Sequence, residues 1–204
     1  VFGAGTRRAR VGAALTGVAV LAGLFAFGSG RLASARVENT DTMVRLVQAN
    51  IAQASKWTPE AYQSIVDRYV GLTAQTPAGR RPDIVVWPEG ALPASANTVF
   101  APGAPEAAAI SAALQPGQIL LMGLARGEPT PGGEDRYFNS LFALADEGGA
   151  GLRVAAVYDK HRLVPFGEYL PLGGLMSTLG VRSLVHMPAD FSAGPKPAPI
   201  DLPG

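Results

Sequence analysis

The sequence predicts an α/β layered domain that follows one membrane-spanning helix. Strand-like runs alternate with helical stretches along most of the chain, an order typical of layered α/β proteins. An uncharged apolar run fills residues 11–28, and the 204 residues, 48% of them hydrophobic, suffice for one domain with a substantial core. We therefore expect a membrane helix with a basic cytoplasmic flank over residues 1–30, a linker over 31–42 and a folded domain over 43–204.

The apolar run at 11–28 is long enough to cross a bilayer. As a helix it spans about 27 Å, against about 30 Å for the hydrocarbon core. Three arginines within residues 7–10 favour a cytoplasmic start, which places everything from Arg31 onward outside the cytoplasm. A cleaved signal peptide is the alternative, because small residues at 33–35 follow the run, but the length of the run favours an anchor.

The first half of the domain reads as strand, helix, strand. Residues 43–48 alternate well enough for a first strand. Thr58 is the expected N-cap of a helix that has Pro59 at its first position and continues to about Thr76, with apolar residues at helical spacing. Residues 84–87 form a short continuous apolar run, as in strands buried on both faces.

The second half continues with a helix, a strand, a loop and a hairpin. The helix is predicted at residues 105–114, the strand at 118–124 and the loop at 126–135. The hairpin is predicted to pair residues 137–144 with residues 153–157. The hairpin turn is expected at 146–149, and the prolines after residue 187 predict an extended tail.

Composition excludes several classes of function. The net charge is +1 and no basic run is interleaved with aromatic residues, so a nucleic-acid partner is not expected. The absence of cysteine excludes disulfides and thiol chemistry within these residues. His161 and His186 lack the spacing of metal ligands, so neither a metal site nor a cofactor is expected.

Three charged residues stand out as candidates for catalysis. Glu89 follows a buried strand directly, at the kind of strand end where sites gather in α/β proteins. Lys160 and Glu168 lie in the segment YDKHRLVPFGEYLP, residues 158–171, whose apolar side chains predict a packed loop and a low-dielectric surrounding for both charges. Such a set can abstract a proton through Glu89 and hold an oxyanion with Lys160 while Glu168 orients the lysine.

Residues 170–187 are rich in apolar side chains, and Arg182 is the only charged residue among them. They are consistent with a buried helix and loop, or with a flexible apolar arm over the site that touches lipid. The two alternatives stay open.

The motifs Trp87-Pro88-Glu89 and YDKHRLVPFGEYLP resemble the apolipoprotein N-acyltransferase family, the membrane branch of the nitrilase, or carbon-nitrogen hydrolase, superfamily. The run at 47–50 and the pair Lys56-Trp57 also resemble the start of that family's catalytic domain. The resemblance implies a nitrilase-like α/β/β/α sandwich, present here in part. It also implies a Glu-Lys-Cys triad, with Glu89 as general base, Lys160 as oxyanion stabiliser and Glu168 as an auxiliary glutamate.

The resemblance further implies substrates and a location. The expected partners are a phospholipid acyl donor, a diacylglyceryl-modified apolipoprotein acceptor and the membrane. The expected location is the bacterial inner membrane, multi-pass in the full-length protein, with the domain on its periplasmic side. Trp57 matches a family tryptophan near the site, and Leu172, Leu175 and Met176 are assigned to substrate binding.

The sequence departs from the family pattern at the nucleophile. The family's cysteine lies on a strand that begins soon after a segment like the one ending at Gly204, so we expect a fragment that is inactive alone. A membrane-tethered nitrilase-like amidase and a non-catalytic membrane-anchored binding domain are the alternatives.

The apolar arm generates a first prediction. Changing Leu172, Leu175 and Met176 together to Ser in the full-length enzyme should raise the apparent KM for lipid donors, because the arm would lose its apolar contacts with the acyl chain. Unchanged lipid kinetics in this variant would instead favour a purely structural role for the segment.

Overall fold

The computed structural model describes residues 6–146, 151–171 and 190–202. The chain divides into two compact units, Val1–Asp41 and Thr42–Gly204. The predicted arm residues Leu172, Leu175 and Met176, and most of the predicted hairpin turn, lie outside the described residues.

The first unit is built on one long helix, α1, Arg7–Ser34. The Thr6 hydroxyl caps its start by accepting a hydrogen bond from the Ala9 amide at 3.4 Å. The helix buries no residue, and its most apolar window has a mean hydropathy of 2.0. By length and composition α1 suits a membrane span, and a signal sequence near an N-terminus has the same character.

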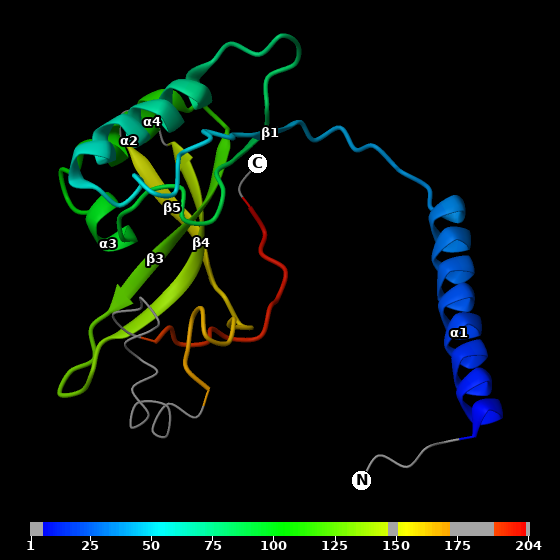
Figure 1. The fold of residues 1–204 in the computed structure, drawn as a ribbon. Helices are drawn as coiled ribbons and strands as arrows, with labels where there is room; N and C mark the ends of the chain where they lie inside the picture. Colours follow the sequence, from blue (N-terminus) through cyan, green and yellow to red (C-terminus); the bar gives the residue numbers. More distant parts are fainter. Residues whose placement is uncertain (1–5, 147–150, 172–189, 203–204) are drawn as a thin grey trace. The chain divides into compact units, whose positions relative to one another are not determined.

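The second unit contains a five-stranded mixed sheet (Figure 1). Its strands, in spatial as well as chain order, are β1 Val44–Leu46, β2 Ile84–Val86, β3 Ile119–Glu128, β4 Arg136–Asp146 and β5 Leu152–Asp159. Strands β1, β2 and β3 are parallel, whereas β4 and β5 each run antiparallel to the preceding strand. All five predicted strands are confirmed.

Helices α2, Pro59–Ala74, and α4, Pro105–Ala113, lie together on one face of the sheet (Figure 1). Both begin with proline, which has no amide hydrogen to leave unpaired in the first turn. Thr58 is the N-cap of α2, as predicted, and the helix ends two residues before Thr76. The short α3, Ala96–Val99, was not predicted, because four residues are too few to show a helical period.

The core lies between these helices and the sheet. Leu120 and Val85 project from neighbouring strands into it, and Trp87, just after β2, is also buried. The Trp87 indole donates a hydrogen bond to the Thr73 hydroxyl at 2.8 Å, and its ring centroid lies 4.8 Å from that of Tyr69. This packing against α2 fixes the end of β2, directly before Glu89.

Strand β3 is longer than predicted and forms with β4 a hairpin that the sequence did not predict. Residues 126–128, expected in a loop, belong to β3 and pair with β4 up to Glu128 opposite Arg136. Arg136 forms an ion pair with Glu128 at 2.8 Å, and the Arg126 guanidinium lies 4.5 Å from the centroid of the Phe138 ring. These cross-strand contacts stabilise the pairing of β3 with β4 at charged residues, whereas the charged residues alone had predicted a loop.

A pair of leucine substitutions tests this account of the core. Leu120→Ala removes a fully buried side chain, which typically costs about 2–5 kcal/mol, so the melting temperature should fall by roughly 5–15 °C in detergent. Leu46→Ala is the matched control in the same sheet, because this leucine is 76% exposed and its loss should change little. Equal melting temperatures for the two variants would contradict the assignment of the core face.

Candidate active site

Glu89 lies in a tight turn at the carboxyl end of β2. The Ala91 amide donates to the Pro88 carbonyl at 3.2 Å, and Gly90 has a φ of +60°, a conformation that glycine adopts without strain. Gly123 on β3 faces the turn, and a Cβ there would lie 2.9 Å from the Glu89 Cα. The backbone of Glu89 therefore packs so closely against β3 that a side chain at position 123 would not fit.

Lys160 immediately follows β5 and its backbone is held on both sides. Its amide donates to the Asn139 carbonyl at 2.8 Å, and its carbonyl accepts from the Gly194 amide at 3.0 Å. The Nζ donates to Glu168 Oε1 at 2.9 Å and lies 3.8 Å from Glu89 Oε1. The three residues singled out from the sequence thus meet in space, although Glu89 is more than 50 positions away from the other two.

The loop that carries Glu168 folds around that residue's own carboxylate. The Glu168 amide donates to the Val164 carbonyl at 2.8 Å, and Glu168 Oε2 accepts from the Val164 amide at 2.8 Å. Phe166 has a φ of +62°, unusual for a bulky side chain, and its amide donates to the Tyr169 carbonyl. Strained backbone of this kind is stable only where surrounding bonds determine it.

The prediction that the apolar side chains of this loop are packed is wrong for Val164, Pro165 and Phe166, which are exposed. The low-dielectric surrounding predicted for Glu168 is confirmed, because only 7% of its surface is exposed. The physical reason is that the carboxylate is fully supplied with donors, so burying it costs less than burying an unpaired charge.

Asn139 joins the two carboxylates and was missed by sequence reasoning. Its Nδ2 donates to Glu89 Oε1 at 2.5 Å and to Glu168 Oε1 at 2.6 Å. Asn139 lies on β4 and is the neighbour of Lys160, the residue that immediately follows β5. A polar residue within an otherwise apolar strand was the available signal, but only the pairing of β4 with β5 gives it meaning.

The electrostatics of the cluster favour charged forms of Lys160 and Glu168. Burial by itself raises the pKa of Glu168, but hydrogen bonds from Lys160, Asn139 and the Val164 amide together outweigh it and lower that pKa. The hydrogen bond to Glu168 raises the pKa of Lys160 against the effect of burial, with help from the charge of Glu89. Lys160 is therefore a fixed ammonium donor.

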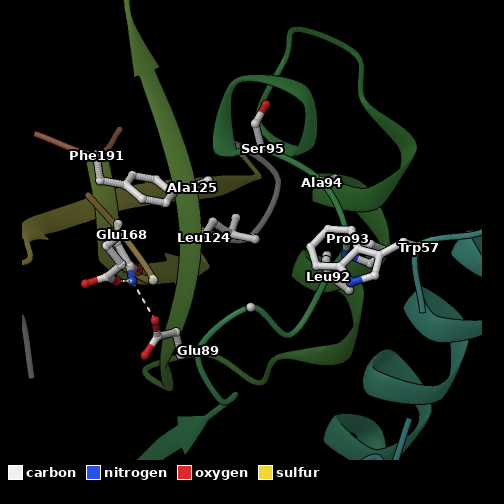
Figure 2. A pocket seen from close by; sticks show the side chains of 13 residues that line it. Trp57, Glu89, Leu92, Pro93, Ala94, Ser95, Leu124, Ala125, Glu168 and Phe191 are labelled. Atoms are coloured by element: carbon white, nitrogen blue, oxygen red, sulfur yellow. Dashed lines mark hydrogen bonds between the residues drawn. The ribbon is translucent and has the colours of Figure 1, made fainter. Parts of the chain in front are cut away.

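Two pockets meet at Glu89 and Asn139. The larger, of about 490 Å³, has mainly apolar walls (Figure 2), and its lining includes Trp57, Leu92, Pro93, Ala94, Leu124, Ala125, Glu168 and Phe191. The smaller, of about 200 Å³, is lined by Glu89 and Lys160 together with Trp87, Gly123, Asn139, Ser140, Leu141 and Tyr158. The cluster thus presents Glu89 and Lys160 to the smaller pocket, and Glu89 and Glu168 to the larger one, and both pockets have mainly apolar walls.

Trp57 and Phe191 form two sides of the larger pocket (Figure 2). Trp57, predicted to contact substrate, is 66% exposed. Phe191 was not predicted; its amide donates to the Glu168 carbonyl at 2.8 Å, which ties the tail to the loop. Among the described residues, no group of three or more His, Cys, Asp or Glu is arranged to hold a metal ion.

The convergence of a carboxylate after β2, an ammonium after β5 and a buried second carboxylate is the arrangement that the resemblance to the carbon-nitrogen hydrolases leads us to expect. Residues 43–203 match the carbon-nitrogen hydrolase family, and the chain belongs to that family.

Within this family, the chain is similar to individual proteins that share one name. The chain is 45% identical over 198 residues to an apolipoprotein N-acyltransferase of Caulobacter vibrioides, an alignment that covers 96% of this chain and 37% of that protein. Proteins of the same name from Brucella suis and Allorhizobium ampelinum are 45% and 37% identical over 77% and 98% of this chain. The chain spans about a third of the length of these relatives, from 29% to 37%.

The lowered pKa of Glu168 predicts a pH-dependent contribution to stability. Because the folded-state pKa is below the unfolded value of about 4.3, the contribution is full above that value and is lost as pH falls through the folded pKa. Glu168→Gln should therefore lower the melting temperature at pH 7, by a loss of about 1–3 kcal/mol, and should flatten the decline in stability below about pH 4.

The matched control is Glu134→Gln, at an exposed position, which should keep the wild-type pH profile. Melting is followed by circular dichroism in detergent from pH 2 to 8. An acid limb for Glu168→Gln as steep as that of the wild type would refute the role given to this carboxylate.

Proposed function

We propose that this chain forms part of an apolipoprotein N-acyltransferase that moves a fatty acyl chain from a phospholipid to the lipid-modified N-terminal cysteine of apolipoproteins. The observation that carries the proposal is the convergence of Glu89, Lys160 and Glu168, beside an apolar pocket, in a chain similar to proteins of that name over nearly its whole length. The relatives are much longer, and we propose that the nucleophilic cysteine comes from a part of the enzyme beyond these 204 residues, so that the chain alone is inactive.

The first half-reaction forms a thioester. Glu89 accepts the thiol proton, and the thiolate attacks the carbonyl carbon of the phospholipid ester. The Lys160 ammonium stabilises the tetrahedral oxyanion, and Glu168 and Asn139 keep the lysine and the base in position. The ester C–O bond then breaks, the proton on Glu89 returns to the departing alkoxide, and a lysophospholipid leaves.

The second half-reaction transfers the acyl chain from the thioester to the acceptor. The amino group of the acceptor attacks the thioester carbonyl, Lys160 again faces the oxyanion, and the C–S bond breaks. Glu89 accepts the proton that the amino group loses and returns it to the departing thiolate, so the thiol is regenerated and the product is an amide. A thiol in the smaller pocket would lie beside both Glu89 and Lys160, whereas the apolar walls of the larger pocket suit an acyl chain.

A membrane setting fits this reaction. Both substrates are held in a bilayer by their acyl chains, and α1 has the length and composition of a span that would keep the enzyme there. We place the domain on the periplasmic side of the inner membrane of a multi-pass protein.

The second candidate is a membrane-tethered amidase of the same family. The same three charged residues suit hydrolysis of a carbon-nitrogen bond, so the cluster alone does not separate the two functions. The pocket walls favour the acyltransferase, because apolar residues such as Leu92, Leu124 and Phe191 would make few favourable contacts with a small polar amide.

Two substitutions in the full-length enzyme test the assignment. General base catalysis is typically worth about 10² to 10⁴ in rate and one oxyanion donor about 10² to 10³, so Glu89→Gln and Lys160→Met should each lower kcat at least about 100-fold. Transfer is measured with a phospholipid donor and a diacylated lipopeptide acceptor, and Glu134→Gln serves as the control.

Near-normal acylation by either variant would remove that residue from the mechanism. Hydrolysis of simple amides without transfer to the lipopeptide would instead establish the amidase, and neither activity in the wild type would establish a binding domain.

A further inference from the structure

Lys56 reaches the turn that carries Glu89 from a different part of the chain. It lies in the loop between β1 and α2, and its Nζ donates a hydrogen bond to the carbonyl of Gly90, 34 residues away. Gly90 immediately follows Glu89 and lines the larger pocket. The lysine is thus bonded to the backbone of the turn and does not contact the carboxylates.

The same ammonium lies beside Trp57. Its Nζ is 5.5 Å from the centroid of the Trp57 ring, a distance at which a cation is attracted to an aromatic face. Burial lowers the pKa of Lys56, consistent with an ammonium partly withdrawn from water. One side chain therefore contacts both the apolar wall formed by Trp57 and the turn of Glu89.

The turn needs a support on this side. Gly123 lies against Glu89 on the side of β3, and the turn's own hydrogen bond runs only from Ala91 to Pro88. Glu89 itself is exposed and receives a hydrogen bond from Asn139 through its carboxylate. A bond to the Gly90 carbonyl restrains the backbone that this carboxylate extends from.

We propose that Lys56 is a positioning residue that fixes the Glu89 turn and the Trp57 wall at a constant separation, so that an acyl chain against Trp57 presents its carbonyl at a fixed distance from the base. The kinetic part of this inference rests on the proposed acyl transfer. The structural part, the coupling of loop and turn, does not.

The structural test uses the 204-residue chain in detergent, whose two tryptophans are Trp57 and the buried Trp87. Lys56→Met keeps the aliphatic stem but removes the donor, and should at least double the amplitude of nanosecond depolarisation in time-resolved fluorescence anisotropy, because the loop is released. Lys56→Arg, which retains a cationic donor, should restore most of the wild-type decay. Lys196→Met, at an exposed position, is the matched control and should change nothing.

The kinetic test uses the full-length enzyme with phosphatidylglycerol and phosphatidylethanolamine as alternative donors. Lys56→Met should lower kcat about 10- to 100-fold for both donors alike, as expected for a misplaced base, and Lys56→Arg should recover at least half of that loss on a logarithmic scale.

An unchanged anisotropy decay in Lys56→Met would overturn the proposal. So would a rise in KM confined to the anionic donor, since that result would make Lys56 a headgroup site. A changed decay in a protein whose wild type transfers no acyl chain would support the coupling and refute the proposed function, so the two failures are distinguishable.

Discussion

The structure of the site depends on one buried carboxylate. Glu168 is withdrawn from water, and such a group is tolerated only when donors replace its hydration. The three donors come from three places: the Val164 amide in the same loop, Asn139 on β4 and Lys160 after β5. Satisfying this carboxylate therefore closes the loop, orients the lysine and engages the asparagine at once.

The position of Glu89 follows from that arrangement and from the sheet. Asn139 uses one amide nitrogen to hold both carboxylates, so the exposed base is placed relative to the buried one. Gly123 allows the turn to approach β3, and a side chain at Gly194 would collide with the carbonyl of Asp159, next to the lysine. Two glycines thus permit close backbone approaches that larger residues would prevent.

The apolar pocket beside the cluster suits the lipid substrate that we propose. The charged groups of the cluster lie where two pockets meet, the smaller one beside Lys160 and the larger one beside Trp57 and Phe191, both with mainly apolar walls. The pocket walls, which include Trp57, Phe191 and the strand residue Leu124, are the feature that favours the proposed acyl donor over a small amide.

The sequence by itself determined the elements and the charged residues. Periodicity located all five strands, α2 and α4, and strand ends drew attention to Glu89 and Lys160, because these signals are local. The pairing of β3 with β4 as far as Glu128, the set of donors around Glu168, and the roles of Asn139 and Lys56 were decided by the tertiary structure. Each depends on partners 8 to 50 residues away, and no local pattern records which distant donor will reach a given carboxylate or carbonyl.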